Sequence, residues 1–172
     1  MDKVILKASK ICKSYKNGDK NLSVLKDFSL EIMQNEIITI TGQSGSGKST
    51  ALNILGTLDS PDSGLLEICG KEIKYLNENK LSELRNKNIG FVFQFHHLLS
   101  EFTSIENVLI PTWIKGAINK KNDAIQLFEK LNLASKINYF PNQLSGGERS
   151  RIALIRAIIN RPDIIFADEP TG

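Results

Sequence analysis

The sequence predicts an α/β fold with a mainly parallel core sheet, an N-terminal antiparallel β subdomain and a helical subdomain. Three observations predict it. Segments with the pattern of strands alternate along the chain with segments of helical period, an order typical of parallel sheets. The N-terminal strands, joined by a short polar turn, look antiparallel. The segment from about residue 103 to residue 133 has a mostly helical pattern.

The N-terminal half combines strands, a glycine-rich turn and a helix. From Phe28 to Ile32, apolar and polar residues alternate, as in a half-buried strand. After a polar turn at Gln34–Asn35, the apolar residues of Ile37–Thr41 lie closer together, as in a strand covered on both faces. A glycine-rich turn then leads into a helix that starts near Lys48. The elements expected next are a turn (60–64), a short strand or hairpin (65–73), a helix (77–87) and a strand (88–93).

The C-terminal half is expected to be mainly helical before a last strand. Thr103 and Glu106 have the spacing of a capping box, which predicts a helix start. Pro111 is expected to end that helix. A long amphipathic helix over 147–160 and a final buried strand over 163–168 complete the prediction.

Composition narrows the possible functions. A chain of 172 residues, of which 41% are apolar, is long enough for one compact domain with a real core. The formal net charge of +3 is small and dispersed, so nucleic acid is not expected as a partner. Cys12 and Cys69 lack metal-ligand spacing and are expected to be reduced thiols. No secretory signal is visible, and no apolar run approaches the roughly 18–20 residues that cross a bilayer, so a role at a membrane is expected to require a partner.

Residues Gly42–Thr50, "GQSGSGKST", fit the phosphate-binding pattern G-x-x-x-x-G-K-[ST]. Glycines allow unusual backbone angles, and they let N–H groups close around phosphate oxygens. Lys48 is predicted to contact the β- and γ-phosphates, Ser49 to bind Mg²⁺, and the following helix to direct its positive end at the anion. The expected nucleotide ligands in this loop are Gly42, Gln43, Ser44, Gly45, Ser46, Gly47, Lys48, Ser49 and Thr50.

Two acids, Asp168 and Glu169, follow the apolar run "IIFA" near the end of the chain. Ligands of open parallel sheets lie outside the carboxyl ends of strands, so Asp168 and the loop of Lys48 are expected at the same edge, around a magnesium-bound triphosphate. Asp168 is predicted to hold Mg²⁺, directly or through water. Successive strand residues point to opposite sides, so Glu169 is free to orient and deprotonate the attacking water.

The motif "LSGGE" at residues 144–148 precedes the long amphipathic helix. Ser145 and Glu148 have capping-box spacing, so the motif is explained in part as a helix start. A cap does not require Gly146 and Gly147, and two glycines beside a serine at a helix N-terminus suit a second anion contact.

In these motifs the sequence resembles the ATP-binding cassette (ABC) ATPases, along the whole chain and in the family's order. The resemblance implies a P-loop NTPase in which Tyr15 stacks on adenine and Gln94 is the Q-loop glutamine, a ligand of nucleotide and Mg²⁺. It also implies that Lys48, Gln94 and Glu169 are the catalytic residues, and that Ser145, Gly146 and Gly147 bind the nucleotide of a second domain. Glu148 departs from the commoner glutamine, but as a capping partner it can point back toward its own helix.

A finer resemblance is to the LolD family, the ATPase subunits of bacterial lipoprotein-releasing systems. It lies in residues 84–111, above all in "FQFHHLLSEFT". His96 and His97 are interpreted there as part of an exposed loop that contacts a partner, because adjacent histidines without a third ligand make a poor metal site. The alternatives are a macrolide-exporter-like or cell-division ABC ATPase, or a nucleotide-binding remnant without efficient hydrolysis. ABC proteins of DNA maintenance or ribosomes are disfavoured by the compact segment between the motifs and the single cassette.

The resemblance has consequences for assembly. It implies ATP and Mg²⁺ as cofactors, a head-to-tail homodimer with a second ATP-binding domain, and integral membrane permease subunits as partners. The expected location is the cytoplasmic face of the bacterial inner membrane. The family pattern continues with a D-loop and a switch histidine, so residues 1–172 are expected to form a C-terminally truncated cassette whose helical subdomain spans about 95–160.

Overall fold

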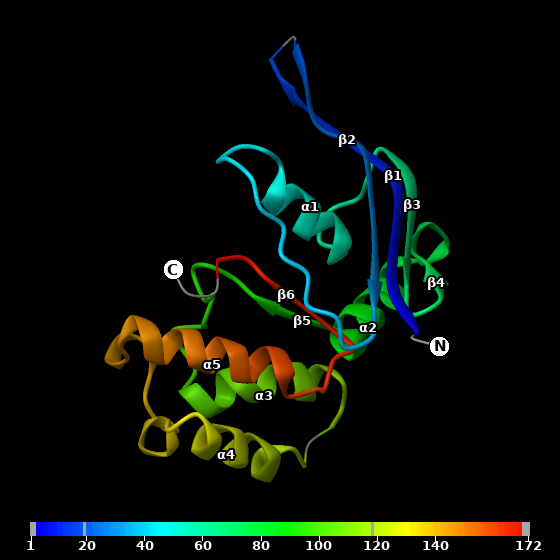
Figure 1. Ribbon diagram of the computed structural model, residues 1–172. Coiled ribbons are helices and arrows are strands. Elements are labelled where there is room, and N and C mark those ends of the chain that lie inside the picture. The colour runs from blue at the N-terminus through cyan, green and yellow to red at the C-terminus, as the bar shows by residue number, and fades with distance from the viewer. Residues whose placement is uncertain (1–2, 19, 118, 170–172) are drawn as a thin grey trace. The chain divides into compact units, whose positions relative to one another are not determined.

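The computed structural model describes residues 3–18, 20–117 and 119–169. The chain forms two compact units, Met1–Ser82 and Glu83–Gly172 (Figure 1). Helix α2 (Glu78–Asn88) begins in the first unit and ends in the second. Both units combine strands with helices, as the sequence predicts for an α/β fold.

The first unit is built on an antiparallel sheet with strand order β2-β1-β3-β4. Its strands are β1 (Val4–Asn17), β2 (Lys20–Met33), β3 (Ser63–Ile68) and β4 (Lys71–Glu72), and a 3-10 turn, η1 (Ile73–Tyr75), follows. Leu6 of β1 pairs with Ile32 of β2 on one side and with Ile68 of β3 on the other. The predicted N-terminal antiparallel subdomain and the hairpin after residue 64 are thereby confirmed.

Helix α1 (Lys48–Leu55) follows the glycine-rich turn, as predicted. Its buried residues are Ala51, Ile54 and Leu55, and the last two are only 1% exposed. Burying each such aliphatic side chain stabilises the unit by about 1.5–3 kcal/mol. This core fixes the helix whose first residue is Lys48.

The predicted strand at Ile37–Thr41 is wrong for the described structure, in which residues 36–43 have no regular secondary structure. Ile37 is 95% exposed. The turn at Gln34–Asn35 is present, as predicted. A run of isoleucines favours a strand only where a neighbour supplies ladder hydrogen bonds, and no sheet in the described residues includes this run.

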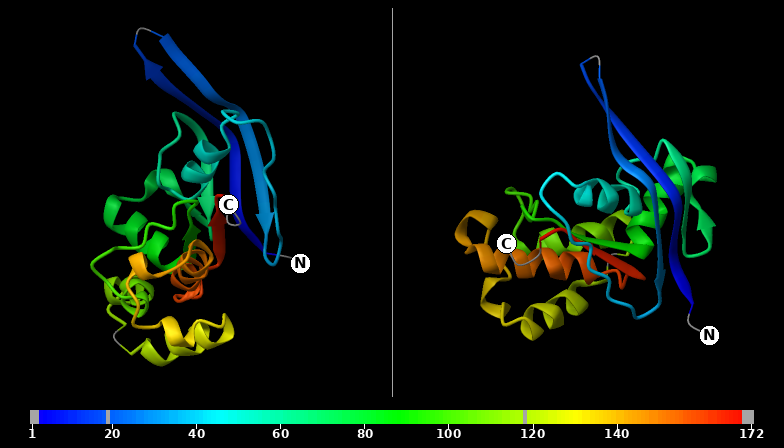
Figure 2. Two further views of the ribbon diagram at one scale, coloured as in Figure 1. Left: turned by 90° about the vertical axis from the view of Figure 1, so that its left-hand side faces the viewer. Right: turned by 45° about the horizontal axis from the view of Figure 1, so that its top comes forward.

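The second unit contains a parallel strand pair and three main helices, which lie together in both views of Figure 2. Strand β5 (Ile89–Val92) pairs with β6 (Ile164–Ala167), in register from Ile89 opposite Ile164. The helices are α3 (Ser104–Ile114), α4 (Lys121–Lys130) and α5 (Gly146–Ile158), with short 3-10 turns η2 (Ala134–Lys136) and η3 (Pro141–Gln143) between the last two. In the described ranges, none of the helices combines the length and the apolar composition needed to cross a bilayer.

The helices of this unit bury one apolar core. Its fully buried members are Val108, Ala124, Phe128, Ile152 and Ile155, with no exposed surface. Helix α5 also packs closely on β5. A Cβ added at Gly90 of β5 would lie only 2.5 Å from the Ala157 carbonyl oxygen of α5, so this position has no room for a side chain. Strand β6 is less covered than its apolar sequence predicts. Ile165 is 45% exposed, because β5 is the only strand paired with β6 in the described residues.

Helix α3 starts as predicted and ends later than predicted. Thr103 and Glu106 form the expected capping box. Pro111, however, lies inside the helix, which continues to Ile114. The carbonyl of Pro111 accepts hydrogen bonds from the side-chain amides of Asn86, at 2.9 Å, and Asn160, at 3.2 Å. The missing N–H of Pro111 deprives the Asn107 carbonyl of its helical donor. Leu109 before Pro111 and Thr112 after it are buried, and their packing holds the helix together there.

Asn107 of α3 organises the loop between β5 and α3. It is fully buried, and its amide nitrogen donates to the carbonyls of Leu99, Phe102 and Thr103 at 2.9–3.1 Å. Its amide oxygen accepts the Leu99 N–H at 2.8 Å. One buried side chain therefore satisfies four backbone groups of the segment 99–103.

Replacing Asn107 by alanine is expected to lower the free energy of unfolding by about 2–4 kcal/mol, because buried backbone groups lose their partners. Urea denaturation of the two proteins measures the difference. The matched control is Asn122→Ala on the exposed surface of α4, which is expected to change stability by less than about 0.5 kcal/mol. A loss for Asn107→Ala no larger than that of the control would contradict the expectation.

Candidate functional site

The predicted phosphate loop has the backbone that its glycines suggest. Gly45 and Gly47 have φ values of 78° and 91°, a region that other residues rarely adopt. A Cβ at Gly47 would lie 3.0 Å from Val24 Cγ1 and 3.1 Å from the Val24 carbonyl oxygen, so β2 leaves no room for a side chain. A Cβ at Gly42 would lie 2.8 Å from Ser46 Oγ. The glycines of the motif are therefore required by the fold of the loop.

The loop supplies two features suited to an anion. The Lys48 ammonium donates to the carbonyls of Gly42 and Gln43, at 2.8 and 2.7 Å, which holds the positive charge inside the loop. Helix α1 begins at Lys48 with no side-chain cap and no acid in its first turn. Its first N–H groups, with the positive end of the helix dipole, suit phosphate oxygens. The loop thus fits the triphosphate that the sequence predicts.

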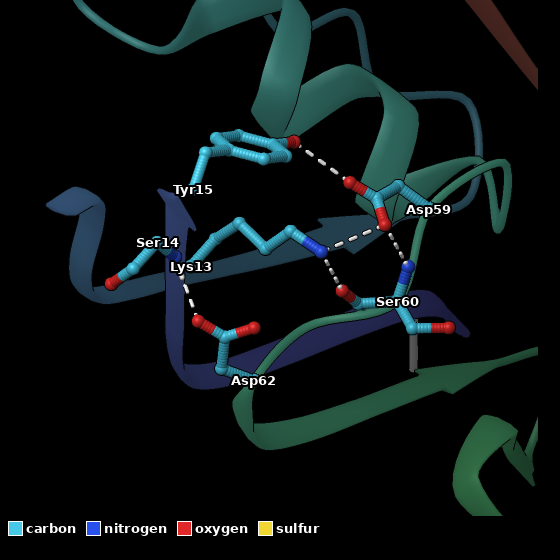
Figure 3. Close-up of polar contacts among 6 residues, drawn as sticks. All are labelled: Lys13, Ser14, Tyr15, Asp59, Ser60 and Asp62. Atoms are coloured by element: carbon cyan, nitrogen blue, oxygen red, sulfur yellow. Dashed lines mark hydrogen bonds and ion pairs between the residues drawn. The ribbon is translucent and has the colours of Figure 1, made fainter. Parts of the chain in front are cut away.

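Tyr15 on β1, the predicted adenine-stacking residue, is 40% exposed and lies in a polar network (Figure 3). Its hydroxyl donates to Asp59 Oδ2 at 2.7 Å, and Lys13 Nζ donates to Asp59 Oδ1 at 2.8 Å. The hydrogen bond to Asp59 raises the pKa of both Tyr15 and Lys13. Desolvation acts to raise the pKa of Asp59, but the hydrogen bonds from Lys13 and Tyr15 outweigh it and lower that pKa. Asp59 belongs to no motif and was not predicted.

At the second unit's strand ends, the structure brings together Gln94 and Glu169. The Gln94 amide, after β5, donates to Glu169 Oε2, after β6, at 2.8 Å. Asp168, the residue before Glu169, is half-buried. Its N–H donates to the Val92 carbonyl at 3.0 Å, which extends the β5–β6 pairing. Parallel strands thus place these polar groups at one edge. That Lys48 and Asp168 meet around the same nucleotide stays a prediction.

The oxygen donors proposed for Mg²⁺ are chemically suited to it. Magnesium prefers oxygen ligands, and it commonly binds one or two carboxylates together with substrate phosphates. Asp168 supplies a carboxylate, Ser49 a hydroxyl in the first turn of α1, and Gln94 an amide oxygen. The donor set fits the ion.

The "LSGGE" motif begins α5 with a complete capping box. Ser145 Oγ accepts the Glu148 N–H at 3.3 Å, and Glu148 Oε2 accepts the Ser145 N–H at 2.7 Å. The backbone and side-chain hydrogen bonds from Ser145, with help from Lys136, lower the pKa of Glu148. The acid therefore points back at its own helix start, as predicted. Gly146 and Gly147 are exposed, and a Cβ at Gly146 would meet nothing within 4 Å.

The two histidines correct one sequence interpretation. His97 is exposed as expected, but His96 is half-buried, with Nε2 lying 2.7 Å from Ser150 Oγ of α5. Arg156 of α5 donates to the carbonyls of His97 and His96 at 2.7 and 2.6 Å. Burial, followed by the charges of nearby arginines, lowers the pKa of His96. The loop after Gln94 is thus attached to α5, because Arg156 satisfies the carbonyls of a tight turn.

Comparison with known proteins identifies the family. The family model described as "ABC transporter" matches residues 25–172. The chain belongs to the ABC transporter family of ATP-binding proteins, in its LolD branch. The lipoprotein-releasing system ATP-binding protein LolD of Shewanella oneidensis is 44% identical over 174 residues, which cover 100% of this chain and 76% of the relative. LolD of Bdellovibrio bacteriovorus is 48% identical, over 97% of this chain and 77% of the relative.

Solved ABC cassettes have the same fold. The dimeric structure of MJ0796, titled a bacterial ABC transporter cassette, matches with a TM-score of 0.92 and 40% identity over 98% of this chain and 75% of that one. A structure titled as the post-hydrolysis state of MJ0796 bound to ADP and Pi matches with a TM-score of 0.85 and 36% identity, over 97% and 75%. The predicted ABC-type α/β P-loop fold is confirmed. The chain spans about three quarters of the length of the relatives it matches.

Proposed function

We propose that this ABC protein is the ATP-binding and ATP-hydrolysing subunit of a bacterial lipoprotein-releasing system. The observation that carries the nucleotide part is the loop of Lys48, whose ammonium and uncapped helix start suit a triphosphate. The lipoprotein part is supported by relatives named LolD that are 44–48% identical over nearly the whole chain. Macrolide export and cell division are less well supported, because these relatives are named for lipoprotein release.

In the proposed mechanism, the chain's residues bind the nucleotide, orient the catalytic carboxylate and activate the attacking water. The loop of Gly42–Thr50 binds the phosphates, and Tyr15 stacks on the adenine. Gln94 holds the Glu169 carboxylate by its amide, and Glu169 accepts the proton of the attacking water. Ser49, Gln94 and Asp168 would hold Mg²⁺, which supplies charge neutralisation for the phosphates when bound.

The proposed assembly is a head-to-tail dimer on membrane subunits. The α5 start at Ser145, Gly146 and Gly147 is exposed and lacks side-chain bulk, so a second copy's nucleotide can approach its N–H groups. This chain would lie at the cytoplasmic face of the inner membrane. The integral permease subunits that it binds would choose the cargo. The exposed side chain of Phe95, 77% accessible next to Gln94, suits contact with such a partner.

The test is reconstitution of the chain with its integral membrane subunits in proteoliposomes that contain a fluorescent acylated lipoprotein. We expect ATP to release the lipoprotein to a soluble acceptor, and we expect a Lys48→Met chain to release none. Lipoprotein release at the same rate without ATP, or failure of the chain to co-purify with the membrane subunits, would contradict the proposal.

A further inference from the structure

A set of polar contacts joins β1 to the turn that follows α1 (Figure 3). Asp59 accepts hydrogen bonds from Tyr15 and Lys13, and Lys13 also donates to the Ser60 carbonyl at 2.6 Å. A separate contact lies beside it, in which the Ser14 N–H donates to Asp62 Oδ2 at 2.7 Å. Two segments about 45 residues apart are thus joined by side chains.

Asp59 is the centre of this network. Each of its two carboxylate oxygens accepts from a different side chain, and Oδ1 also accepts the Ser60 N–H at 2.7 Å. Lys13 is only 9% exposed, so its ammonium depends on these partners. Its Nζ lies 5.2 Å from the centre of the Tyr15 ring, which adds a cation–π contact on the same side chain.

The network is tied directly to the phosphate-binding helix. The N–H groups of Leu58 and Asp59 both donate to the Asn53 carbonyl of α1, at 2.8 and 3.2 Å. Asp59 therefore moves with α1, whose first residue is Lys48.

We propose that Asp59, held by Lys13, is a positioning residue that fixes the Tyr15 ring relative to the phosphate loop, so that base and phosphates bind together. This inference rests on the proposed stacking of adenine on Tyr15. The hydrogen bond at the tyrosine hydroxyl restrains the χ1 rotamer of a half-exposed side chain, and thereby the place of its ring. The conformational entropy of the Tyr15 side chain is then lost when the chain folds and not when ATP binds.

The experiment compares ATP with inorganic tripolyphosphate, which lacks the base, by calorimetric titration of the full chain. Tyr15→Phe removes the hydroxyl and keeps the ring, without disturbing the Lys13–Asp59 pair. Asp59→Ala removes the anchor. Asp62→Ala is the matched control, since it breaks a contact of the same turn with β1 that does not involve Tyr15. Tyr15→Ala is the reference for complete loss of stacking.

We expect Tyr15→Phe and Asp59→Ala to weaken ATP binding about fivefold, with tripolyphosphate binding unchanged. The double variant Tyr15→Phe/Asp59→Ala is expected to lose no more than the single ones, because both remove the same contact. Asp62→Ala is expected to keep the wild-type ratio of the two affinities. Should Asp59→Ala not fold, Tyr15→Phe alone decides the question.

Three results would overturn the inference. A wild-type affinity ratio in Tyr15→Phe, with a clear loss in Tyr15→Ala, would leave the stacking role intact and remove the positioning role. An equal loss for both ligands would assign Asp59 to stability alone. An unchanged ratio in Tyr15→Ala would show that the adenine does not lie on Tyr15, and the inference and the stacking role would fail together.

Discussion

Replacing Glu169 by glutamine is expected to slow ATP hydrolysis at least about 100-fold, while ATP affinity stays within about threefold. Glu169 is exposed, lies two residues after the end of β6 and accepts a hydrogen bond from Gln94. A carboxylate there can take a proton from water, whereas an amide of the same shape cannot. Phosphate release and nucleotide titration, measured on the same preparations, separate the two effects.

The control for Glu169→Gln is Glu101→Gln in the same unit. Glu101 is an exposed carboxylate that accepts the Ser100 hydroxyl at 2.8 Å, in the loop before α3. Its loss of charge is expected to leave the hydrolysis rate within about twofold. If Glu169→Gln hydrolysed ATP as fast as the control, Glu169 would not be the base. If it lost ATP affinity to the same extent as rate, the carboxylate would act in binding.

Gln94 links this prediction to the rest of the molecule. Its amide orients Glu169, and the loop that follows it is attached to α5 through Arg156 and His96. The N-cap of helix α5 is Ser145, a residue proposed to reach a second copy's nucleotide. The geometry thus connects the proposed base and the proposed dimer contact by two hydrogen-bonded steps within one unit.

Most elements of the fold are predictable because local patterns determine them. Two capping boxes, at Thr103 and Ser145, satisfy the free N–H groups of the helices that they begin. The glycines of the phosphate loop allow its positive φ values. Two of the predictions that differ from the structure, the strand at 37–41 and the helix end at Pro111, depend on residues elsewhere in the chain. Residues 37–41 look like a strand but lack a ladder in the described structure, and Pro111 stays in a helix in which Leu109 before it and Thr112 after it are buried.

The candidate site divides in the same way. The candidate residues of the motifs were identifiable from the sequence, some by their spacing and others, such as Tyr15 and Gln94, by the family resemblance, and their roles in a site stay predictions. Their side-chain partners were not, because Tyr15 and Asp59 are 44 residues apart and His96 and Arg156 are 60 apart. Asp59 is a single aspartate in a polar turn, and nothing in the sequence around it indicates that it binds Tyr15. The first contact depends on how β1 packs near the turn after α1, and the second on how the loop after β5 packs on α5. Neither packing is encoded in a local stretch of the sequence.

Replacing Lys48 by methionine is expected to weaken binding of both ATP and tripolyphosphate about tenfold or more, and to reduce hydrolysis at least about 100-fold. The ammonium is fixed between two carbonyls of its own loop, at 2.8 and 2.7 Å, so the charge is in place before a phosphate arrives. Methionine has a similar length but carries no charge and no N–H, so the Gly42 carbonyl loses the Lys48 donor and the Gln43 carbonyl keeps only the Ser46 N–H at 3.2 Å. Titration with both ligands, followed by phosphate release, measures the losses.

Lys26→Met is the matched control, because Lys26 is an exposed lysine of β2 in the same unit. It removes one positive charge without touching the loop, and long-range attraction alone is screened within about 10 Å at ordinary salt. We therefore expect its affinities to stay close to wild type. Glu169→Gln and Lys48→Met are expected to differ in kind. The first should lose hydrolysis and keep nucleotide binding, whereas the second should lose binding of tripolyphosphate as well as ATP. Wild-type tripolyphosphate affinity in Lys48→Met would mean that the glycine-rich loop does not hold the phosphates, and the nucleotide assignment would fail with it.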